Sequence, residues 1–595
     1  MWNGGEGMKN NQKILMVSLL GVTLLSSCGL NIYDFVRGST SHKEAKSDDL
    51  SSLQEAKMYG YKASGNDYVP YDVISGSLTY RKIEDVPYIT VADAISLLSF
   101  NNTTVEISGD VYSHSLPISL SSSIKIDVDS EADTITFSDY DLFCSEVVGS
   151  KKVNNISGLV EESNSFVRYS ADGCSYSSKG KTTFDLLSYS LDVIAYDKDV
   201  YIPFAAANEI FIQPLGLNFI YNGRDFYIAE SSAFTYSGSD TLSTYGRKYY
   251  TGPLGIKGKS SNYALFNYNM LCFSIDHFYG FLDKGFSPID EYLEKNYRSV
   301  KNGLKSTKNS TYEEAASILL YGILGDGHTG VYGYSSIFGD GKFDVSSSAL
   351  SDRYISISRT GQELTSLRKM TLGASFSNVR YSSNTAIITF DEFDSAYKTF
   401  TQATVFNYQN SDTFAFLYAA FRNIASRSNV KNVVFDLSLN GGGAVDGLIG
   451  SLGFLTNDVK INLYNPLTKS EAKLSYAVDA NLDGKIDSSD VKSKYSFFVL
   501  TSPYTFSCAN LFANVCKEQG LATIIGEKSG GGACVVRNSV TADGLTFQMS
   551  GDSRLSNTLL NGEFQDIDDG VSPDHSFSRT SFYSDSALAK FVENL

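Results

Sequence analysis

The sequence predicts an α/β protein with a mainly parallel sheet in its C-terminal part, preceded by a β-rich region. From about residue 385 onward, apolar strands such as VKNVVFDL and SFFVLTS alternate with helical segments, which is typical of βαβ crossovers. Between residues 66 and 235, short runs of alternating apolar and polar residues are separated by turn residues, which is typical of antiparallel strands. At 595 residues, the chain is long enough for two to four domains.

The N-terminus has the pattern of a bacterial export signal. Lys9 and Lys13 precede an apolar run at residues 14–25, which is too short to span a membrane, and small residues then lead to Cys28. The segment resembles a lipoprotein signal, which implies cleavage before Cys28 and attachment of lipid to this cysteine. An ordinary secretory peptide is the alternative. In either case we expect an exported protein, and in the first case one anchored outside the cytoplasm by lipid.

The segments after the signal differ in composition, so we expect them to have different roles. A Ser-, Lys- and Asp-rich stretch at residues 29–65 predicts a flexible tether. The β-rich accessory domain at residues 66–235 is expected to serve docking rather than chemistry. Helical spacing of apolar residues predicts a helical cap at residues 262–330, ahead of a core at residues 331–595.

The composition argues against a nucleic-acid partner. Asp and Glu outnumber Lys and Arg by 66 to 49, the formal net charge is −17, and no basic patch that could neutralise phosphates is evident. Apart from Cys28, the cysteines show no metal-binding spacing and are expected to be buried thiols. Cys144 and Cys174 are a possible disulfide pair in an exported protein.

Two junctions between a strand and a helix could carry chemistry. The run Asn440-Gly-Gly-Gly443 follows an apolar strand, and its glycines could let backbone N–H groups line an oxyanion site, although a tight turn would look the same. Ser507 lies at the second junction, where a helix N-terminus stabilises negative charge. The alternative is that Ser507 is only the helix N-cap.

Five segments follow one another along the chain, namely GDGHTG, FDLSLNGGG, TFSCAN, IIGEKSGGG and DIDDGVSPD. In this order they resemble the C-terminal-processing and tricorn-type serine peptidases over about residues 262–595. The resemblance implies a crotonase-like βαβ spiral core that hydrolyses protein or peptide substrates. It makes Ser507 the nucleophile, with the N–H groups of Cys508 and of Gly442, or its neighbour Gly441, as oxyanion donors. The segment before the strand at Ala386 is too short for the PDZ module that this family often carries.

Members of the family activate the serine with either a lysine or a histidine. Aligning the lysine-containing turn on residues 526–532 puts Gly532 at the lysine position, and Lys528 falls on a variable one. His328, in GDGHTG, matches the histidine of the tricorn-like branch. A neutral imidazole can accept the serine proton near neutral pH, so we expect activity to rise through about pH 6 to 7.

A carboxylate is needed to orient the imidazole, and the family places it just before the element that is Gly570-Val-Ser-Pro-Asp574 here. We favour Asp568, with Asp566, Asp569 and Glu563 as alternatives. The other histidines are weaker candidates for the base. His42 lies in the tether, His114 is expected at the surface or in a turn, His277 on an apolar helix face, and His575 at the start of a surface strand.

Residues 479–490, DANLDGKIDSSD, reproduce a calcium loop of EF-hand or dockerin type. Oxygen donors recur at the ligand positions, a glycine stands at position 6 and an apolar residue at position 8. A solvated acidic loop is the alternative, and we expect bound calcium to brace the insertion. The predicted ligands are Asp479, Asn481, Asp483, Lys485, Asp487 and Asp490.

The sequence therefore predicts a lipid-anchored extracytoplasmic serine endopeptidase with structural Ca²⁺ and no cofactor for catalysis. Two alternatives remain. One is a catalytically inactive binding protein of the same fold, and the other is a surface adhesin that acts through residues 66–235.

Overall fold

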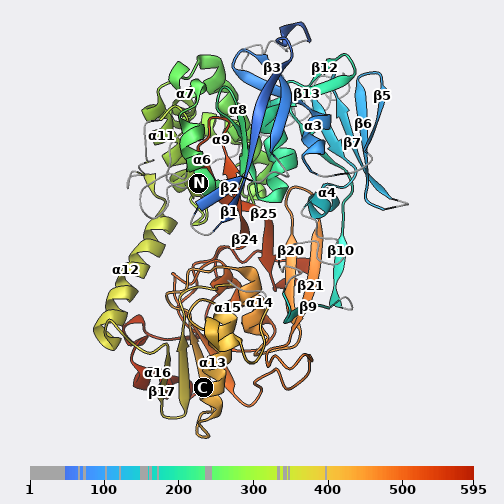
Figure 1. Cartoon of the computed structure of the whole chain (residues 1–595). Coiled ribbons are helices and arrows are strands. Elements are labelled where there is room, and N and C mark those ends of the chain that lie inside the picture. Colours follow the sequence, from blue (N-terminus) through green and yellow to red (C-terminus); the bar gives the residue numbers. More distant parts are fainter. Residues whose placement is uncertain are drawn as a thin grey trace, which may run out of the picture.

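The computed structural model describes the chain from residue 47 to its C-terminus with several gaps (Figure 1). The gaps are residues 65–66, 71–74, 99, 101–102, 120–121, 148–158, 160–163, 171–172, 235–243, 332–335, 340–342, 344, 346–348 and 396–398. The predicted signal segment, Cys28 and His42 lie outside the described residues. Within the described ranges, no helix combines the length and apolarity needed to cross a membrane.

A six-stranded sheet, whose edge strand β17 is labelled in the lower part of Figure 1, confirms the predicted mainly parallel topology. All of its neighbouring strands are parallel except β17, which pairs antiparallel with β18 at one edge. In sheet order the strands are β17 (Val379–Ser382), β18 (Thr385–Thr389), β19 (Asn432–Asp436), β22 (Ser496–Thr501), β23 (Thr523–Gly526) and β28 (His575–Ser576).

Both faces of this sheet are covered, which explains why its strands are apolar at consecutive positions. Val433 and Val499 pack into one core, whereas their neighbours Val434 and Leu500 pack into another on the opposite face. The first core is completed by α13 (Thr413–Ala425), α14 (Val445–Leu452) and α15 (Cys508–Glu518). The second is completed by α12 (Asp352–Leu372) and α16 (Asp585–Val592).

A second, mostly antiparallel sheet joins the N-terminal region to the C-terminal region. Strands β9 (Val167–Tyr169) and β10 (Ser175–Ser177) both pair with β21 (Glu471–Val478), although about 300 residues separate them in the chain. Figure 1 shows these strands side by side between the upper and lower parts of the molecule. The remaining strands are β16 (Gly330–Val331), β20 (Val459–Tyr464), β24 (Cys534–Val540) and β25 (Thr546–Ser556), and a separate hairpin comprises β26 (Leu559–Leu560) and β27 (Glu563–Phe564).

The N-terminal region is rich in β-structure, as predicted, but it begins earlier than expected. Strand β1 (Gln54–Ser64) lies inside the predicted tether and pairs with β2, β3 and β15, so the tether prediction is wrong for these residues. The other strands of this sheet are β2 (Asp67–Pro70), β3 (Gly76–Ile83), β4 (Val86–Thr90), β12 (Ile194–Tyr196), β13 (Asp199–Pro203), β14 (Asn218–Tyr221) and β15 (Phe226–Ala229). A five-stranded sheet contains β5 (Thr104–Ser108), β6 (Val111–Pro117), β7 (Ser123–Asp129), β8 (Thr134–Phe137) and β11 (Thr182–Asp185).

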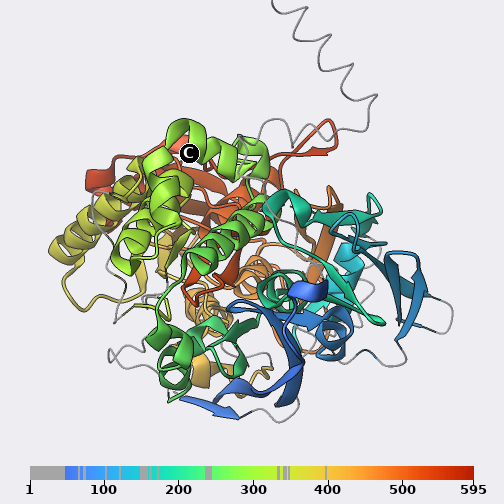
Figure 2. The same cartoon turned by 90° about the horizontal axis from the view of Figure 1, so that it is seen from above.

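The predicted helical cap is present and packs directly on the N-terminal region, as Figure 2 shows from above. One hydrophobic core contains Phe211 of the N-terminal region, Phe273 and Leu319 of the cap, and Phe547 of β25. The cap helices are α8 (Ser261–Phe278), α9 (Ile289–Asn296), α10 (Arg298–Leu304) and α11 (Asn309–Ser317), which continues into a π-helical turn, η8 (Ile318–Leu324). Shorter helices are α3 (Val91–Ser96), α4 (Tyr140–Val147), α5 (Phe204–Ala207), α6 (Thr244–Tyr250) and α7 (Pro253–Lys257).

Two smaller predictions can also be compared with the structure. His114 lies buried on β6, not at the surface as predicted, because its side chain falls on the inward-facing set of positions of this strand. Burial lowers the pKa of His114 to about 4. Cys144 and Cys174 are both free, and so are the other cysteines in the described part of the chain, so the possible disulfide is not formed.

Candidate active site

Ser507 occupies a strained turn between β22 and α15. Its φ of 53° and ψ of −124° are unusual for a residue with a side chain, and such conformations cluster at functional sites. A hydrogen bond from its N–H to the carbonyl of Gly531, at 2.8 Å, holds the turn. Ser507 stands at the N-cap position, but its side chain makes no capping hydrogen bond. The N-cap alternative therefore does not explain a serine here, and the partly exposed hydroxyl is available for other chemistry.

The glycine loop after β19 lies directly against Ser507. Gly442 has a φ of 116°, and a Cβ at this position would come within 2.6 Å of the Cβ of Ser507 and 3.1 Å of the backbone nitrogen of Cys508. A residue with a side chain therefore does not fit, and glycine is required for the loop to approach the serine so closely.

The hydrogen bonds of this loop show which backbone N–H groups near the predicted oxyanion donors already have acceptors. The N–H of Gly442 donates to Oδ1 of Asn440 at 2.9 Å, and that of Gly441 donates to the carbonyl of Asp391 at 3.3 Å. Both groups are therefore engaged in this arrangement. Among the hydrogen bonds of the described residues, none takes up the N–H of Gly443 or of Cys508. Cys508 directly follows Ser507 in the chain, and its thiol donates to the carbonyl of Gly443, so both residues lie next to the turn that carries the serine.

The thiol of Cys508 does not compete with Ser507 as a nucleophile. Its Sγ donates to the carbonyl of Gly443 at 3.0 Å, and the side chain is buried. Burial raises the pKa of Cys508 to about 12, so the reactive thiolate does not form near neutral pH.

His328 is held in a buried turn that follows the π-helical end of the cap. The carboxylate of Asp326 accepts hydrogen bonds from the backbone N–H groups of His328 and Thr329, both at 2.8 Å. The imidazole packs against Phe506, the residue before Ser507, with 4.7 Å between ring centroids. The turn after the cap thus places His328 next to the turn that carries Ser507.

The two ring nitrogens of His328 have different surroundings. Nδ1 lies 3.3 Å from Oγ of Ser550 on β25, whereas Nε2 is buried and has no hydrogen-bond partner in the described part of the molecule. If Nδ1 carries the proton and donates to Ser550, the lone pair on Nε2 is free to accept a proton. Burial lowers the pKa of His328, although the charges of Asp326 and Asp568 oppose this effect.

Asp568 is buried near the histidine, but its carboxylate is bound to two cations. Oδ2 accepts hydrogen bonds from Arg353 at 2.9 Å and from Lys284 at 3.0 Å. Burial would raise the pKa of Asp568, but Arg353 and Lys284 hold it below the usual value. The structure describes no hydrogen bond between Asp568 and His328, so Asp568 influences the imidazole through its charge. The alternatives Asp566, Asp569 and Glu563 are exposed.

The comparison with protein families decides the class of this region. Residues 384–577, which include the glycine loop and Ser507, match the model of peptidase family S41. This segment is similar to the serine peptidase domains of family S41 and is called the S41 domain below. The predicted resemblance to such peptidases is therefore confirmed over these residues, whereas His328 lies ahead of the matched segment.

Solved structures similar to the chain share little sequence with it. A candidate peptidase from Parabacteroides merdae is 16% identical, with 57% of this chain and 98% of that chain covered and a TM-score of 0.39. A lipoprotein from Streptococcus agalactiae is 15% identical, with 56% and 98% covered and a TM-score of 0.34. The tricorn protease is 11% identical, with 89% and 47% covered and a TM-score of 0.28. No curated protein matches the chain.

The S41 domain leaves no space for a catalytic lysine at position 532. A Cβ on Gly532 would come within 2.7 Å of Cζ of Phe506, so the phenyl ring fills the space where a side chain would project. Lys528 is exposed. Of the other histidines, His277 is half-buried with Nδ1 2.8 Å from the carbonyl of Phe273, and His575 is exposed at the start of β28.

The predicted calcium loop of the S41 domain is folded around two of its carboxylates. Asp479 accepts hydrogen bonds from the N–H groups of Asp483 and Gly484, and the buried Asp490 accepts from those of Asn481 and Asp487. In the residues that the structure describes, no group of three or more His, Cys, Asp or Glu side chains is gathered closely enough to hold a metal ion. The predicted ligands are mainly oxygen atoms, which Ca²⁺ prefers. In this structure the carboxylates of Asp479 and Asp490 accept hydrogen bonds from backbone N–H groups.

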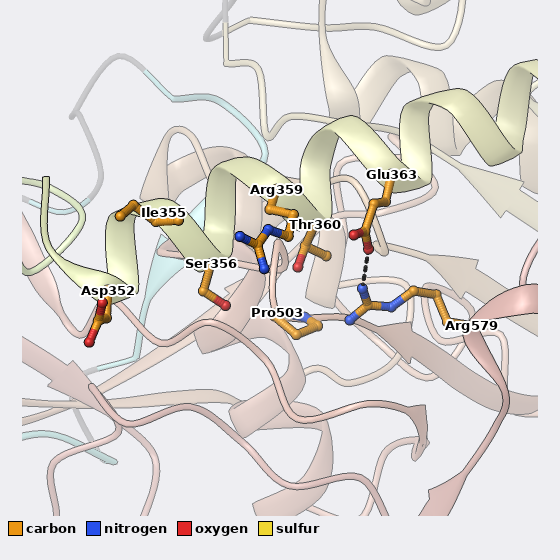
Figure 3. Close-up of a pocket in the computed structure, with 8 residues that line it drawn as sticks. All are labelled: Asp352, Ile355, Ser356, Arg359, Thr360, Glu363, Pro503 and Arg579. Atoms are coloured by element: carbon orange, nitrogen blue, oxygen red, sulfur yellow. Dashed lines mark hydrogen bonds and ion pairs between the residues drawn. The ribbon is translucent and has the colours of Figure 1, made fainter. Parts of the chain in front are cut away.

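Two cavities flank helix α12 beside the turn between β22 and α15 that carries Ser507, which is called the nucleophile turn below. The larger, of about 730 Å³, reaches Gly327 and Phe506, the residues directly before His328 and Ser507. The smaller, of about 360 Å³, lies against another face of the helix and is bordered by Pro503 and Arg579 (Figure 3). The larger cavity is thus the one that opens beside the candidate catalytic residues.

Proposed function

We propose that the chain is an extracytoplasmic serine endopeptidase in which Ser507 is the nucleophile and His328 the general base. The observation that carries this proposal is the combination of an uncapped serine in a strained turn with a buried histidine whose Nε2 has no partner in the described part of the molecule. Acyl transfer requires a presented hydroxyl, backbone N–H groups that can bind an oxyanion, and a base that reaches the hydroxyl. The packing of the His328 imidazole against Phe506, the residue before Ser507, supports His328 as that base.

In the proposed reaction, Oγ of Ser507 attacks the carbonyl carbon of the scissile peptide while Nε2 of His328 takes its proton. The negative charge that develops on the carbonyl oxygen is bound by the N–H groups of Cys508 and Gly443. Nε2 then returns the proton to the leaving amine, which leaves an acyl-enzyme. A water molecule, deprotonated by the same nitrogen, hydrolyses the ester and regenerates Ser507.

The imidazole needs a partner at Nδ1 that keeps the proton there. Ser550 supplies a neutral acceptor at 3.3 Å, and the buried charge of Asp568 favours the protonated imidazole that forms during the reaction. We therefore assign Ser550 the role of positioning His328 and Asp568 an electrostatic role. The core that carries these residues is proposed to be of the crotonase-like spiral type.

Labelling with a fluorophosphonate tests the nucleophile and separates a peptidase from an inactive binding protein of the same fold. We expect the probe to attach to Ser507, as located by mass spectrometry, and to be lost in Ser507→Ala. The neighbouring Ser502, whose hydroxyl donates to the carbonyl of Ser438, is the matched control and should remain unlabelled. Absence of labelling in a folded protein would favour the binding function.

Attachment to a membrane through lipid on Cys28 is a separate part of the proposal. It is supported by the residues before Cys28, which have the charge and length of a cleaved lipoprotein signal. Metabolic labelling with a fatty-acid analogue should mark the wild-type protein and not Cys28→Ser. Equal labelling of both would contradict the lipid anchor, and export without labelling would indicate an ordinary secretory peptide.

Binding of Ca²⁺ in the insertion is also proposed. Asp479, Asp483, Asp487 and Asp490 would supply carboxylates, Asn481 an amide oxygen and Lys485 its backbone carbonyl. Bound Ca²⁺ would supply a fixed positive charge that ties the insertion together. The chain passes through this insertion between β21 and β22. Ordering of the insertion by Ca²⁺ would therefore help to fix β22, the strand that leads to Ser507.

A further inference from the structure

The cavity of about 730 Å³ forms a cleft between helix α12 and the nucleophile turn. On one side, Phe506 and Gly327 connect it to the catalytic pair, and on the other, residues of α12 form its wall. A volume of this size lies within the usual range for ligand-binding clefts. The lining residues are Gly327, Tyr354, Ile357, Ser358, Gly361, Gln362, Thr365, Ser366, Tyr504 and Phe506.

None of the residues that line this cleft carries a charge. Tyr354, Ile357, Tyr504 and Phe506 contribute aromatic and aliphatic surface, and the others contribute hydroxyl, amide or glycine backbone groups. The absence of charge follows from the orientation of the helix. The cleft positions on α12 recur at intervals of three or four residues, so they lie along one face.

The other cavity beside α12 shows that charge is present on a different face of the same helix. Figure 3 shows Arg359 and Glu363 on that face, with Glu363 bound to Arg579 at 2.8 Å. Its lining also includes Asp352 and Ser356. Helix α12 therefore has an uncharged cleft on the face toward Phe506 and a charged cavity on another face.

A cation beside the Phe506 ring is already neutralised. The guanidinium of Arg353 lies 5.6 Å from the centre of the Phe506 ring, but it donates to the carboxylate of Asp568 and to the carbonyl of Gly530. A carboxylate in the cleft would therefore compete with Asp568 for this arginine. An ammonium group in the cleft would find no carboxylate among the lining residues.

The helix is fixed against the nucleophile turn by close packing. A Cβ on Gly361 would come within 2.5 Å of Cε2 of Tyr504, so the helix backbone touches this ring directly. Leu364 is fully buried in the core beneath the sheet. These contacts hold the cleft wall of α12 firmly against the turn that carries Ser507.

We propose that this cleft binds a segment of the polypeptide substrate with uncharged, apolar or aromatic side chains, and that α12 thereby sets the charge preference of the peptidase. The inference rests on the proposed peptidase function. A charged side chain that enters the cleft loses water without gaining an ionic partner, whereas an apolar one gains contact with Tyr354, Tyr504 or Phe506.

A set of fluorogenic peptides that differ at one position tests this inference. At each position around the scissile bond, the residue is Leu, Asp or Lys, and kcat/KM is measured for each peptide. With the wild-type enzyme we expect at least one position at which both charged peptides are cleaved about tenfold less well than the Leu peptide. Acceptance of charged residues at every position would overturn the inference.

Charged substitutions on the helix give a matched comparison. Ser358 lies in the cleft and Ser356 on the opposite cavity, and both are exposed. Ser358→Lys should raise the ratio of Asp-peptide to Lys-peptide cleavage about tenfold at the sensitive position, and Ser358→Asp should lower it. The same changes at Ser356 should leave this ratio unchanged.

The outcomes separate the cleft from the proposed function itself. If Ser507-dependent cleavage occurs but the ratio responds equally at both serines, or at neither, the assignment of the cleft is overturned while the peptidase function stands. If no peptide is cleaved in a manner that Ser507→Ala abolishes, the proposed function fails and the inference falls with it.

Discussion

The hydroxyl of Ser550 is the group that holds Nδ1 of His328, at 3.3 Å in a fully buried position. We expect Ser550→Ala to lower kcat about 10- to 100-fold with little change in KM, because the imidazole loses its orientation and tautomer. Ser550→Thr keeps the hydroxyl and should retain most of the activity. Steady-state kinetics of the two variants, together with their melting temperatures, separate positioning from folding. Full activity in Ser550→Ala would remove the residue from the mechanism.

The pKa of His328 predicts the pH dependence of the reaction. Because burial lowers this pKa, kcat/KM should rise through an ionisation below the usual imidazole value of about 6.5, which shifts the pH 6 to 7 expected from the sequence downward. The charge of Asp568 raises the pKa, so Asp568→Asn should move the ionisation further down. An ionisation above pH 7 would contradict the buried base, and one above about pH 8.5 would point to a lysine.

Some residues of the proposed site could be predicted from the sequence, and others could not. Ser507 and His328 lie in short motifs, and the order of these motifs along the chain predicts that the two residues lie close together in the fold. Ser550 stands in no motif, because it reaches His328 through the folding of β25 beneath the cap. The donors of the oxyanion site depend on which N–H groups of the glycine loop are already bonded, and Gly441 and Gly442 are indistinguishable from Gly443 in the sequence.

The insertion between β21 and β22 is predicted to bind Ca²⁺. Titration calorimetry should detect one Ca²⁺ site in the wild type that is absent in Asp479→Ala, because Asp479 holds position 1 of the loop. The exposed Glu518, at the end of α15, gives the charge-matched control Glu518→Ala, which should bind normally. A stabilising shift of the melting temperature should accompany binding. No heat and no shift would reduce the insertion to a charged turn.

The pattern of strands and helices predicted most elements but missed how distant ones combine. The parallel sheet followed from apolar strands alternating with helices. Strand β1 was missed because Glu55 and Lys57 interrupt its apolar pattern, although both lie at exposed positions of the strand that pairs with β3. The pairing of β9 and β10 with β21 could not be predicted, because nothing local in either segment specifies a partner about 300 residues away.

At the scale of the whole molecule, a buried ion pair connects the N-terminal region to the S41 domain. Glu209 and Arg537 are 3.2 Å apart, and Glu209 also accepts hydrogen bonds from Ser274 and Ser539. Glu209→Ala leaves Arg537 buried without its partner, so we expect the free energy of unfolding to fall by about 3–5 kcal/mol. The exposed Glu131 provides the control Glu131→Ala, with a change within about 0.5 kcal/mol. Equal denaturation curves for both variants would show that the two regions are not coupled.

The shared core also bears on the adhesin alternative. Residues of the N-terminal region, the cap and β25 form one hydrophobic cluster, so the segment 66–235 lacks part of its own packing surface. A function carried by this segment alone would require it to fold without its partners. The structure therefore favours a molecule that acts as one unit around the peptidase site.

Hydrolysis of a peptide mixture by matched variants tests the central claim most directly. Ser507→Ala and His328→Ala should each reduce the rate by several orders of magnitude, because both take part in the proton transfer, whereas Lys528→Ala should leave it unchanged. The retained fold of each variant is checked by its melting temperature. Loss of activity in Lys528→Ala with His328→Ala still active would contradict the proposed mechanism.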